Sequence, residues 1–267
     1  EFLCEHNALR MRALQREIME ELGYDLEEGV KKGEVLSVSE LAEALAPPFA
    51  PVRFRTWFYR VDLSRRITFK VDSGEFADSF WKTPKELLET FKTGKSLMVP
   101  PTRWVLEGLK KNHQASAFGD LSQNFAENKT VPCLEMLEGV PQYAVRSATL
   151  PPASRTNAFL LGDADAPKLL VDPSPNSEEE YQRLLNTIEH KKLDSIFLTH
   201  HHPDHHQFSN QLARQLKLPI ILSEDTQQRL TLKNGDDYFE QVELRNVVEN
   251  EEVTRWHGSA VRVYEIP

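Results

Sequence analysis

The sequence predicts an α/β protein with two domains. Its 267 residues are enough for about two domains of ordinary size. Short apolar segments, such as residues 195–198, alternate along the chain with segments of helical periodicity, such as residues 207–217. The loop between these two segments is the first candidate site, because α/β folds usually place their chemistry on the loops that follow strands.

This loop is rich in histidine. Five of the nine histidines lie within residues 200–206, and Asp204 is among them. Imidazoles beside a carboxylate are typical of a transition-metal site. His200 and His202 are two positions apart, so in extended backbone they project to the same side. Asp204 and His205 follow where the chain turns into the helix. A solvated polar loop or a purification tag is the alternative, but a tag would lie at a terminus and would lack Pro-Asp.

The pattern His-x-His-x-Asp-His resembles the metal motif of the metallo-β-lactamase-fold hydrolases. The resemblance implies that His200 and His202 hold one metal ion and that Asp204 and His205 hold a second. It implies one or two Zn²⁺ ions, with Asp204 as the catalytic residue that helps to orient the attacking hydroxide. His201 and His206 lie outside the pattern.

The order of elements around the motif is similar to the opening half of the same fold, an αββα sandwich. Strands are expected near residues 143–150, 157–161 and 168–171, followed by a helix that Ser177 caps. Thr156-Asn157 and Asp172-Pro173 stand where the family has similar residues. Asp172 either orients a ligating histidine or serves as a turn residue at the end of a strand.

The resemblance covers residues 131–267 and is partial. In the family, the third histidine of the first metal follows a strand like the one expected at residues 219–222, after a few further residues, and the bridging carboxylate and the final histidine come later still. Residues 261–266 are expected to form a strand that reaches the end of the sequence, so we expect the C-terminal part of the domain to be missing and the chain to be a fragment. Zinc should be held weakly, because catalytic zinc normally has three protein ligands. Activity is expected of the full-length parent, and whether this piece alone is active stays open.

A second candidate metal site lies near the N-terminus. Residues 11–22 have the periodicity of a helix, and three carboxylates share one of its faces: Glu17, Glu20 and Glu21. Hard oxygen ligands suit Mg²⁺ or Mn²⁺. The alternative is an ordinary solvated acidic face.

Residues 16–24 resemble the second half of a Nudix box, the motif of enzymes that cleave nucleoside diphosphates linked to another group. The resemblance implies Glu20 and Glu21 as the main ligands, with Glu17 beside them. The first half of the box departs from the family, because Ala8 and Phe2 stand where a glutamate and a glycine are expected. We therefore predict a degenerate or truncated Nudix-like α/β/α domain over residues 1–111.

The rest of this domain is predicted from local patterns. We expect a helix over residues 39–46, a strand over residues 53–63, and residues 67–71 as its partner. Thr83 with Glu86 forms the signature of a capping box, and a further helix begins at Pro100. The polar residues 112–130 are predicted to link the two domains.

The net charge, the apolar runs and the cysteine content of the sequence limit the kinds of partner and compartment that we expect. The net charge of -9 does not indicate a nucleic-acid surface, although a local basic groove stays open. The sequence has no apolar run long enough to cross a membrane. Cys4 and Cys133 are far apart, which favours a reducing compartment; we expect the cytoplasm, with an organelle as the alternative. The expected partner is a small-molecule substrate, and the oligomeric state is left open.

The combined prediction is a metal-dependent hydrolase in which a zinc-activated water attacks a small ester or thioester. One alternative is a nuclease of the same fold that acts on RNA. Another is a Nudix-type nucleoside diphosphate hydrolase activity in the N-terminal domain. A third is that the N-terminal domain only binds a ligand or stabilises the hydrolase.

Overall fold

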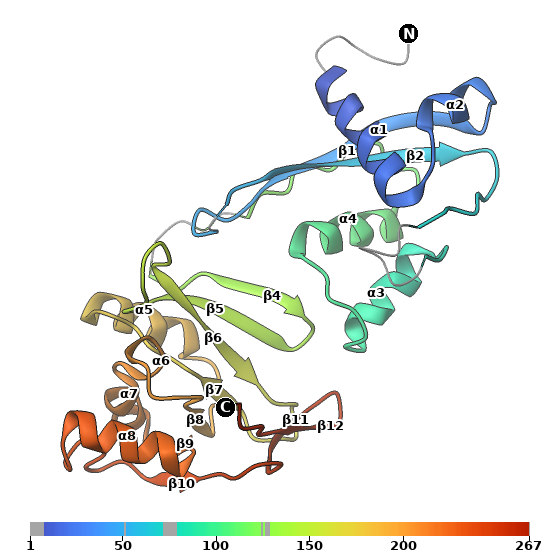
Figure 1. Ribbon diagram of the computed structural model, residues 1–267. Helices are drawn as coiled ribbons and strands as arrows, with labels where there is room; N and C mark the ends of the chain where they lie inside the picture. The colour runs from blue at the N-terminus through green and yellow to red at the C-terminus, as the bar shows by residue number, and fades with distance from the viewer. Residues whose placement is uncertain (1–7, 51, 72–78, 124, 126–128, 267) are drawn as a thin grey trace. The chain divides into compact units, whose positions relative to one another are not determined.

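The computed structural model describes residues 8–50, 52–71, 79–123, 125 and 129–266. The chain forms two compact units (Figure 1). The first comprises Glu1–Leu45, Phe54–Leu88 and Trp104–Ser122, and the second comprises Ala46–Arg53, Glu89–Arg103 and Gln123–Pro267. The predicted boundaries at residues 111 and 131 stay predictions.

The first unit contains a small mixed sheet, two helices that precede it, and parts of helices α3 (Pro84–Lys92) and α4 (Pro100–Lys111). Helices α1 (Ala8–Leu22) and α2 (Leu26–Lys31) precede the sheet, whose strand order is β2-β1-β3. Strand β1 pairs antiparallel with β2 and parallel with β3. The three strands are β1 (Val35–Leu45), β2 (Arg55–Leu63) and β3 (Gly119–Asp120).

The predicted helix over residues 39–46 is wrong, because these residues form most of β1. Alanine, glutamate and leucine favour a helix locally. The strand instead pairs with β2 along its length, with Glu40 opposite Tyr59 and Glu43 opposite Trp57. This pairing buries Leu41 and satisfies the backbone of the segment, which outweighs a weak local propensity. Residues 67–71 are not a strand.

Several other local predictions in this half of the chain are confirmed. Helix α1 ends at Leu22, and its predicted apolar stripe is half-buried. Helix α3 (Pro84–Lys92) begins after a capping box: the Thr83 N–H donates to Glu86 Oε2 at 2.7 Å, and the Glu86 N–H donates to Thr83 Oγ1 at 3.3 Å. Helix α4 (Pro100–Lys111) begins at the predicted proline. Residues 119–120 of the predicted linker pair with β1 as strand β3.

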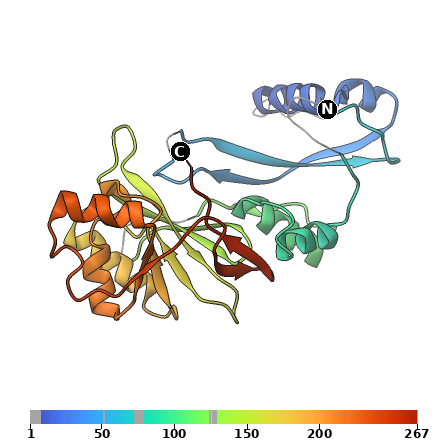
Figure 2. The same ribbon diagram turned by 60° about the horizontal axis from the view of Figure 1, so that its bottom comes forward.

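The second unit is built on a seven-stranded sheet (Figures 1 and 2). The strand order is β10-β9-β8-β7-β6-β5-β4, and β7 to β10 are parallel whereas β4 to β7 are antiparallel. The strands are β4 (Cys133–Leu137), β5 (Val140–Arg146), β6 (Arg155–Leu161), β7 (Leu169–Val171), β8 (Ser195–Phe197), β9 (Ile220–Leu222) and β10 (Leu244–Asn246).

The central strands β7 and β9 are buried on both faces of the sheet. Side chains alternate across a strand, so Leu170 packs into one hydrophobic cluster whereas Leu169 and Val171 pack into another. The first cluster includes residues from helices α5 (Glu178–Ile188), α7 (Ser209–Leu216) and α8 (Glu224–Asn234). The second includes Val253 of the hairpin formed by β11 (Glu252–Trp256) and β12 (Ser259–Arg262). The unit is therefore a mixed α/β fold with both faces covered.

Two elements of this unit differ from their predictions. The helix expected over residues 207–217 is α7, which begins only at Ser209, after Phe208 with a left-handed φ of 62°. A separate short helix, α6 (Pro203–His206), precedes it. The strand expected over residues 261–266 runs only through β12, because its partner β11 pairs with residues 259–262. Helix α5 is confirmed, with Ser177 as its N-cap.

Among the described residues, none of the helices has the length and apolar character to cross a bilayer.

Candidate metal centre

The sheet brings two distant segments together at one edge. Strands β7 and β8 are parallel neighbours, with Val171 opposite Phe197, so both chains leave the sheet at their carboxyl ends side by side. Asp172 follows β7 directly, and its N–H donates to the Phe197 carbonyl at 2.9 Å. The histidine loop follows β8. The placement of both segments thus results from the parallel pairing of two short buried strands.

Asp172 organises the start of the loop. The residue is 5% exposed, and its carboxylate accepts two hydrogen bonds from Thr199, from the N–H to Oδ1 at 2.8 Å and from Oγ1 to Oδ2 at 2.6 Å. Its backbone φ is 49°, in the left-handed region that aspartate and asparagine tolerate better than most residues. Of the two predicted roles for Asp172, the contacts favour the one at the site.

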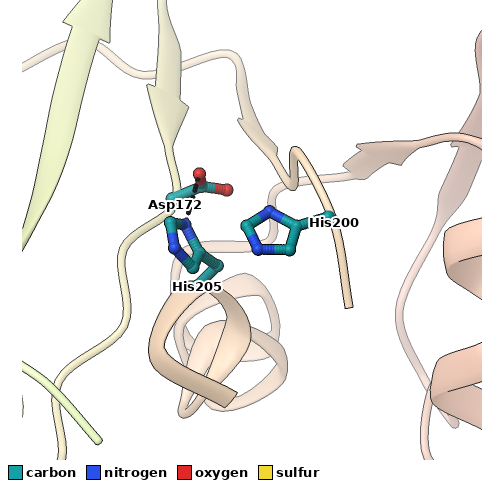
Figure 3. Close-up of side chains that lie close together, drawn as sticks. All are labelled: Asp172, His200 and His205. Atoms are coloured by element: carbon teal, nitrogen blue, oxygen red, sulfur yellow. Dashed lines mark hydrogen bonds and ion pairs between the residues drawn. The ribbon is translucent and has the colours of Figure 1, made fainter. Parts of the chain in front are cut away.

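The same carboxylate orients His205. His205 Nδ1 lies 2.8 Å from Asp172 Oδ2, which leaves Nε2 as the ring nitrogen that does not contact this carboxylate (Figure 3). A carboxylate that accepts one ring N–H while the other ring nitrogen faces a metal is a common arrangement in metalloproteins. This tautomer suits a metal ligand, because only an unprotonated Nε2 can bind an ion.

Three side chains of the site lie close together. Asp172, His200 and His205 each offer a ligand atom, and the three atoms lie within 4.8 Å of one another (Figure 3). Within the part of the chain that the structure describes, this is the one group of three or more such side chains close enough to hold an ion. The identity of the ion does not follow from this geometry.

His200 and His202 form the first predicted pair of ligands. His200 Nε2 lies 3.0 Å from His202 Nδ1, and His200 Nδ1 lies 2.9 Å from Thr199 Oγ1. Two nitrogens bound to one tetrahedral zinc at about 2.0–2.1 Å would lie about 3.3 Å apart. The observed separation is close to that value, so these two nitrogens fit one ion with little movement.

Asp204 and His205 form the second predicted pair. Asp204 Oδ2 lies 3.6 Å from His205 Nε2, on the first turn of α6. The separation is again near the edge of a tetrahedral site. Neither His202 nor Asp204 belongs to the group of three, so their roles as ligands stay predictions.

The local charges affect the histidines differently. Burial lowers the pKa of His200, and the neighbouring His205 and His202 lower it further. For His205, burial lowers the pKa, but the hydrogen bond and charge of Asp172, with Asp204, outweigh burial and raise it. The negative charge of these carboxylates therefore stabilises a positive charge on the His205 ring.

The two histidines outside the motif have other surroundings. His206 is buried, its Nδ1 lies 2.7 Å from the Tyr238 hydroxyl, and burial lowers its pKa to about 4. His206 thus anchors α6 to the segment that follows α8. The nearest ring to His201 is that of His202, with 5.0 Å between the centroids. His201 does not belong to the converging group.

The glutamates of α1 do not form a comparable group in the described structure. Arg16 instead contacts two of them, with Nη2 at 2.5 Å from Glu17 Oε1 and Nε at 3.7 Å from Glu20 Oε2. The hydrogen bond and charge of Glu17 raise the pKa of Arg16. Metal binding by Glu17, Glu20 and Glu21 therefore stays a prediction. Ala8 is the first residue of α1, and Phe2 lies outside the described residues.

Sequence reasoning did not single out two hydroxyl residues at the site. Thr199 links Asp172 to His200, and its position directly before the motif was the available signal. Thr156 was noted only for its likeness to the family, but its Oγ1 donates to Asp204 Oδ2 at 3.4 Å. No sequence signal connects Thr156 with Asp204, because 48 residues separate them.

Comparison with known proteins supports the assignment of this region. Residues 151–266 match the family model of the metallo-beta-lactamase superfamily. This match supports a metallo-β-lactamase-fold domain over these residues. It covers none of the residues of the predicted Nudix-like domain.

Two solved structures are similar to part of the chain. VMB-1, crystallised at pH 5.5, has 19% sequence identity and a TM-score of 0.35, and the match covers 46% of this chain and 54% of that one. A metallo-β-lactamase from Hirschia baltica has 17% identity and a TM-score of 0.36, covering 48% and 58%. The chain thus spans little more than half the length of either structure. No curated protein matches the chain.

Proposed function

We propose that the second unit is the catalytic part of a metal-dependent hydrolase that cleaves a small ester or thioester. The observation that supports this most is the convergence of Asp172, His200 and His205 at the carboxyl edge of the sheet. His202 Nδ1, 3.0 Å from His200 Nε2, adds a further imidazole beside this group. Imidazole and carboxylate together suit Zn²⁺.

Each residue of the motif would have a separate role in metal binding or catalysis. His200 and His202 would hold one Zn²⁺, and Asp204 with His205 would hold a second. When bound, zinc lowers the pKa of a coordinated water to about 7 and polarises the scissile carbonyl. Asp204 would accept a hydrogen bond from the attacking water and so orient it. Asp172 would keep Nδ1 of His205 protonated and Nε2 available.

We favour an ester or thioester over RNA as the substrate because of the net charge of the chain. A nuclease of this fold needs a surface that attracts phosphates, and the chain carries a net charge of -9. No described contact in the site favours RNA over a small acyl substrate, so the nuclease is an outcome of the test. We place the enzyme in a reducing compartment such as the cytoplasm, in line with an exposed free thiol at Cys133.

The first unit is proposed to be catalytically degenerate. Two of its three candidate carboxylates already contact Arg16. Ala8 stands where the Nudix family has a glutamate. Binding a ligand without turnover, or stabilising the second unit, is the role that remains for it.

A chelation experiment tests the proposed hydrolase. The chain is stripped of metal, reloaded with Zn²⁺, and assayed against a panel of esters, thioesters and short RNAs. Acyl hydrolysis that disappears on chelation and returns with Zn²⁺ supports the proposal. Hydrolysis that survives chelation contradicts a metal-dependent mechanism, and zinc-dependent cleavage of RNA alone contradicts the substrate class.

A further inference from the structure

The geometry points to Thr156 and Ser147 as a pair of positioning residues that hold the Asp204 carboxylate in place for the second metal ion. This inference rests on the proposed function. Ser147 Oγ lies 2.5 Å from Thr156 Oγ1, and Thr156 Oγ1 lies 3.4 Å from Asp204 Oδ2. The three polar groups thus form a chain that begins in the sheet and ends at a predicted metal ligand.

The sheet brings the two hydroxyl groups together. Strands β5 and β6 are antiparallel, with Val145 opposite Thr156. Ser147 follows β5 by one residue, and its N–H donates to the Ser154 carbonyl at 3.3 Å, so the ladder continues past the end of the strand. Ser147 is 5% exposed, so its hydroxyl has little access to water that would compete with Thr156. The pair is therefore fixed by backbone pairing.

Hydrogen-bond chemistry sets the direction of the chain. An ionised carboxylate only accepts, and a threonine hydroxyl has a single hydrogen to donate. If Thr156 donates to Asp204, its oxygen must accept from Ser147. The hydrogen bonds therefore run from Ser147 to Thr156 to Asp204, and Ser147 fixes the rotamer of the threonine hydroxyl.

The oxygen of Asp204 that accepts this hydrogen bond is also the one next to the other predicted ligand of the second metal ion. Asp204 Oδ2 receives the threonine hydroxyl and is also the oxygen 3.6 Å from His205 Nε2. Asp204 lies on a helix of four residues and its side chain is 20% exposed, so its helix alone does little to restrict it. Thr156 contributes the missing restraint. Groups that orient a metal ligand in this way typically change metal affinity by roughly 10–100-fold when removed.

The test follows the two ligand pairs separately in the intact chain. The chain without metal is titrated with Zn²⁺ while the ring resonances of His200, His202 and His205 are recorded by NMR. Thr156→Val removes the hydroxyl at nearly constant volume, and Thr156→Ser keeps it. Ser147→Ala removes the first donor. We expect Thr156→Val to weaken the transition seen at His205 by roughly 10-fold or more, with the transition at His200 unchanged and Thr156→Ser close to wild type.

The outcomes separate this inference from the proposed function. If zinc shifts none of the three rings in the wild-type chain, the metal site and the proposed function both fail. If the wild-type transitions occur and Thr156→Val leaves that of His205 unchanged, the positioning role is wrong while the proposed function stands. Equal weakening at His200 and His205, or no rescue by Thr156→Ser, would indicate a general structural effect and would also overturn the inference. In the Asp204→Asn background, Thr156→Val should have no further effect on zinc affinity.

Discussion

Asp172 and His205 are 33 positions apart, and Asp172 Oδ2 lies 2.8 Å from His205 Nδ1. The same carboxylate holds the backbone of Thr199. One buried aspartate at the end of β7 therefore secures both the beginning of the histidine loop and the histidine on α6. These contacts preorganise the loop, so we expect its predicted ligands to bind metal without large rearrangement.

Asp172→Asn is predicted to weaken zinc binding by roughly 10–100-fold. An amide cannot accept on both sides, so one of the contacts to Thr199 or His205 becomes a clash of donors. Asparagine tolerates the left-handed φ of 49°, so backbone strain does not confound the result. Zinc titration measures the effect.

Asp163→Asn is the matched control. Asp163 accepts two backbone N–H groups, from His257 and Gly258, at 2.9 Å and 2.8 Å, in a loop without candidate metal ligands. It should lower thermal stability and leave zinc affinity unchanged. Equal loss of zinc affinity in both variants would show that Asp172 acts only through stability.

The predicted ligands are tested by alanine substitution. His200→Ala should abolish zinc binding at the first pair and hydrolysis with it. Asp204→Ala should cost activity more than folding, because its side chain is partly exposed and builds little of the core. Zinc content, turnover and thermal unfolding are measured for each variant.

His201→Ala is the control for the register of the motif, because His201 lies outside the converging group. It should keep zinc and activity. Damage equal to that of His200→Ala would mean that the ligands are assigned in the wrong register. Full activity of Asp204→Ala on every substrate would contradict a two-metal mechanism.

Glu180→Ala is predicted to destabilise the second unit by about 3–5 kcal/mol. Glu180 is 1% exposed, and its carboxylate lies 2.8 Å from Arg183 Nη1 and accepts the Arg146 N–H at 2.9 Å. Removing it leaves a buried guanidinium without its charge partner. Chemical denaturation measures the change.

Glu178→Ala on the same helix is the control. Glu178 is exposed, and it contacts Gln182 on the surface. Its loss should cost less than about 1 kcal/mol, mainly through the charge at the helix N-terminus. A similar cost for both substitutions would mean that the buried pair contributes no more than a surface charge.

Gly94→Ala should destabilise the second unit more than Gly258→Ala does. Both glycines have positive φ, 68° and 73°, so alanine costs about 1–2 kcal/mol at either site. A Cβ at Gly94 would also lie 2.6 Å from His257 Cδ2 and 2.7 Å from the Trp256 ring. That ring is held by its Nε1, which donates to the Glu138 carbonyl at 2.8 Å.

The crowding at Gly94 should add about 1–3 kcal/mol. Gly258 has open space around the position of a Cβ, so it reports the conformational cost alone. Thermal unfolding of the two variants isolates the difference. Equal costs would show that the loop after α3 moves aside without penalty.

The first unit is predicted to lack efficient Nudix activity. A screen of dinucleoside polyphosphates, nucleotide sugars and coenzyme A with Mg²⁺ or Mn²⁺ should show no robust turnover. The paired Arg16 and the alanine at position 8 are the reasons. Robust turnover that Glu20→Gln abolishes would refute the claim of degeneracy.

Local sequence patterns determined several elements of this protein. The capping box at Thr83 and the serine cap of α5 depend on contacts three residues apart, so they could be read directly. The histidine motif and its position after an apolar strand depend on neighbouring residues too. For the same reason, the resemblance of this region to the metallo-β-lactamase fold could be recognised from the residue pattern of the motif.

Contacts between residues that are distant in sequence determined the remaining features: strand β1, the extent of the two units and the assembly of the candidate site. Residues 39–46 form a strand because β2 pairs with them, and that partner is invisible to a local helix propensity. Segments 46–53 and 89–103 fall in the second unit, although they come from the first 111 residues. The parallel pairing of β7 and β8 places Asp172 against His205, and the turn into α6 places Asp204 near Thr156. Sequence patterns report neighbours a few residues apart, whereas a metal site is assembled by the packing of whole strands.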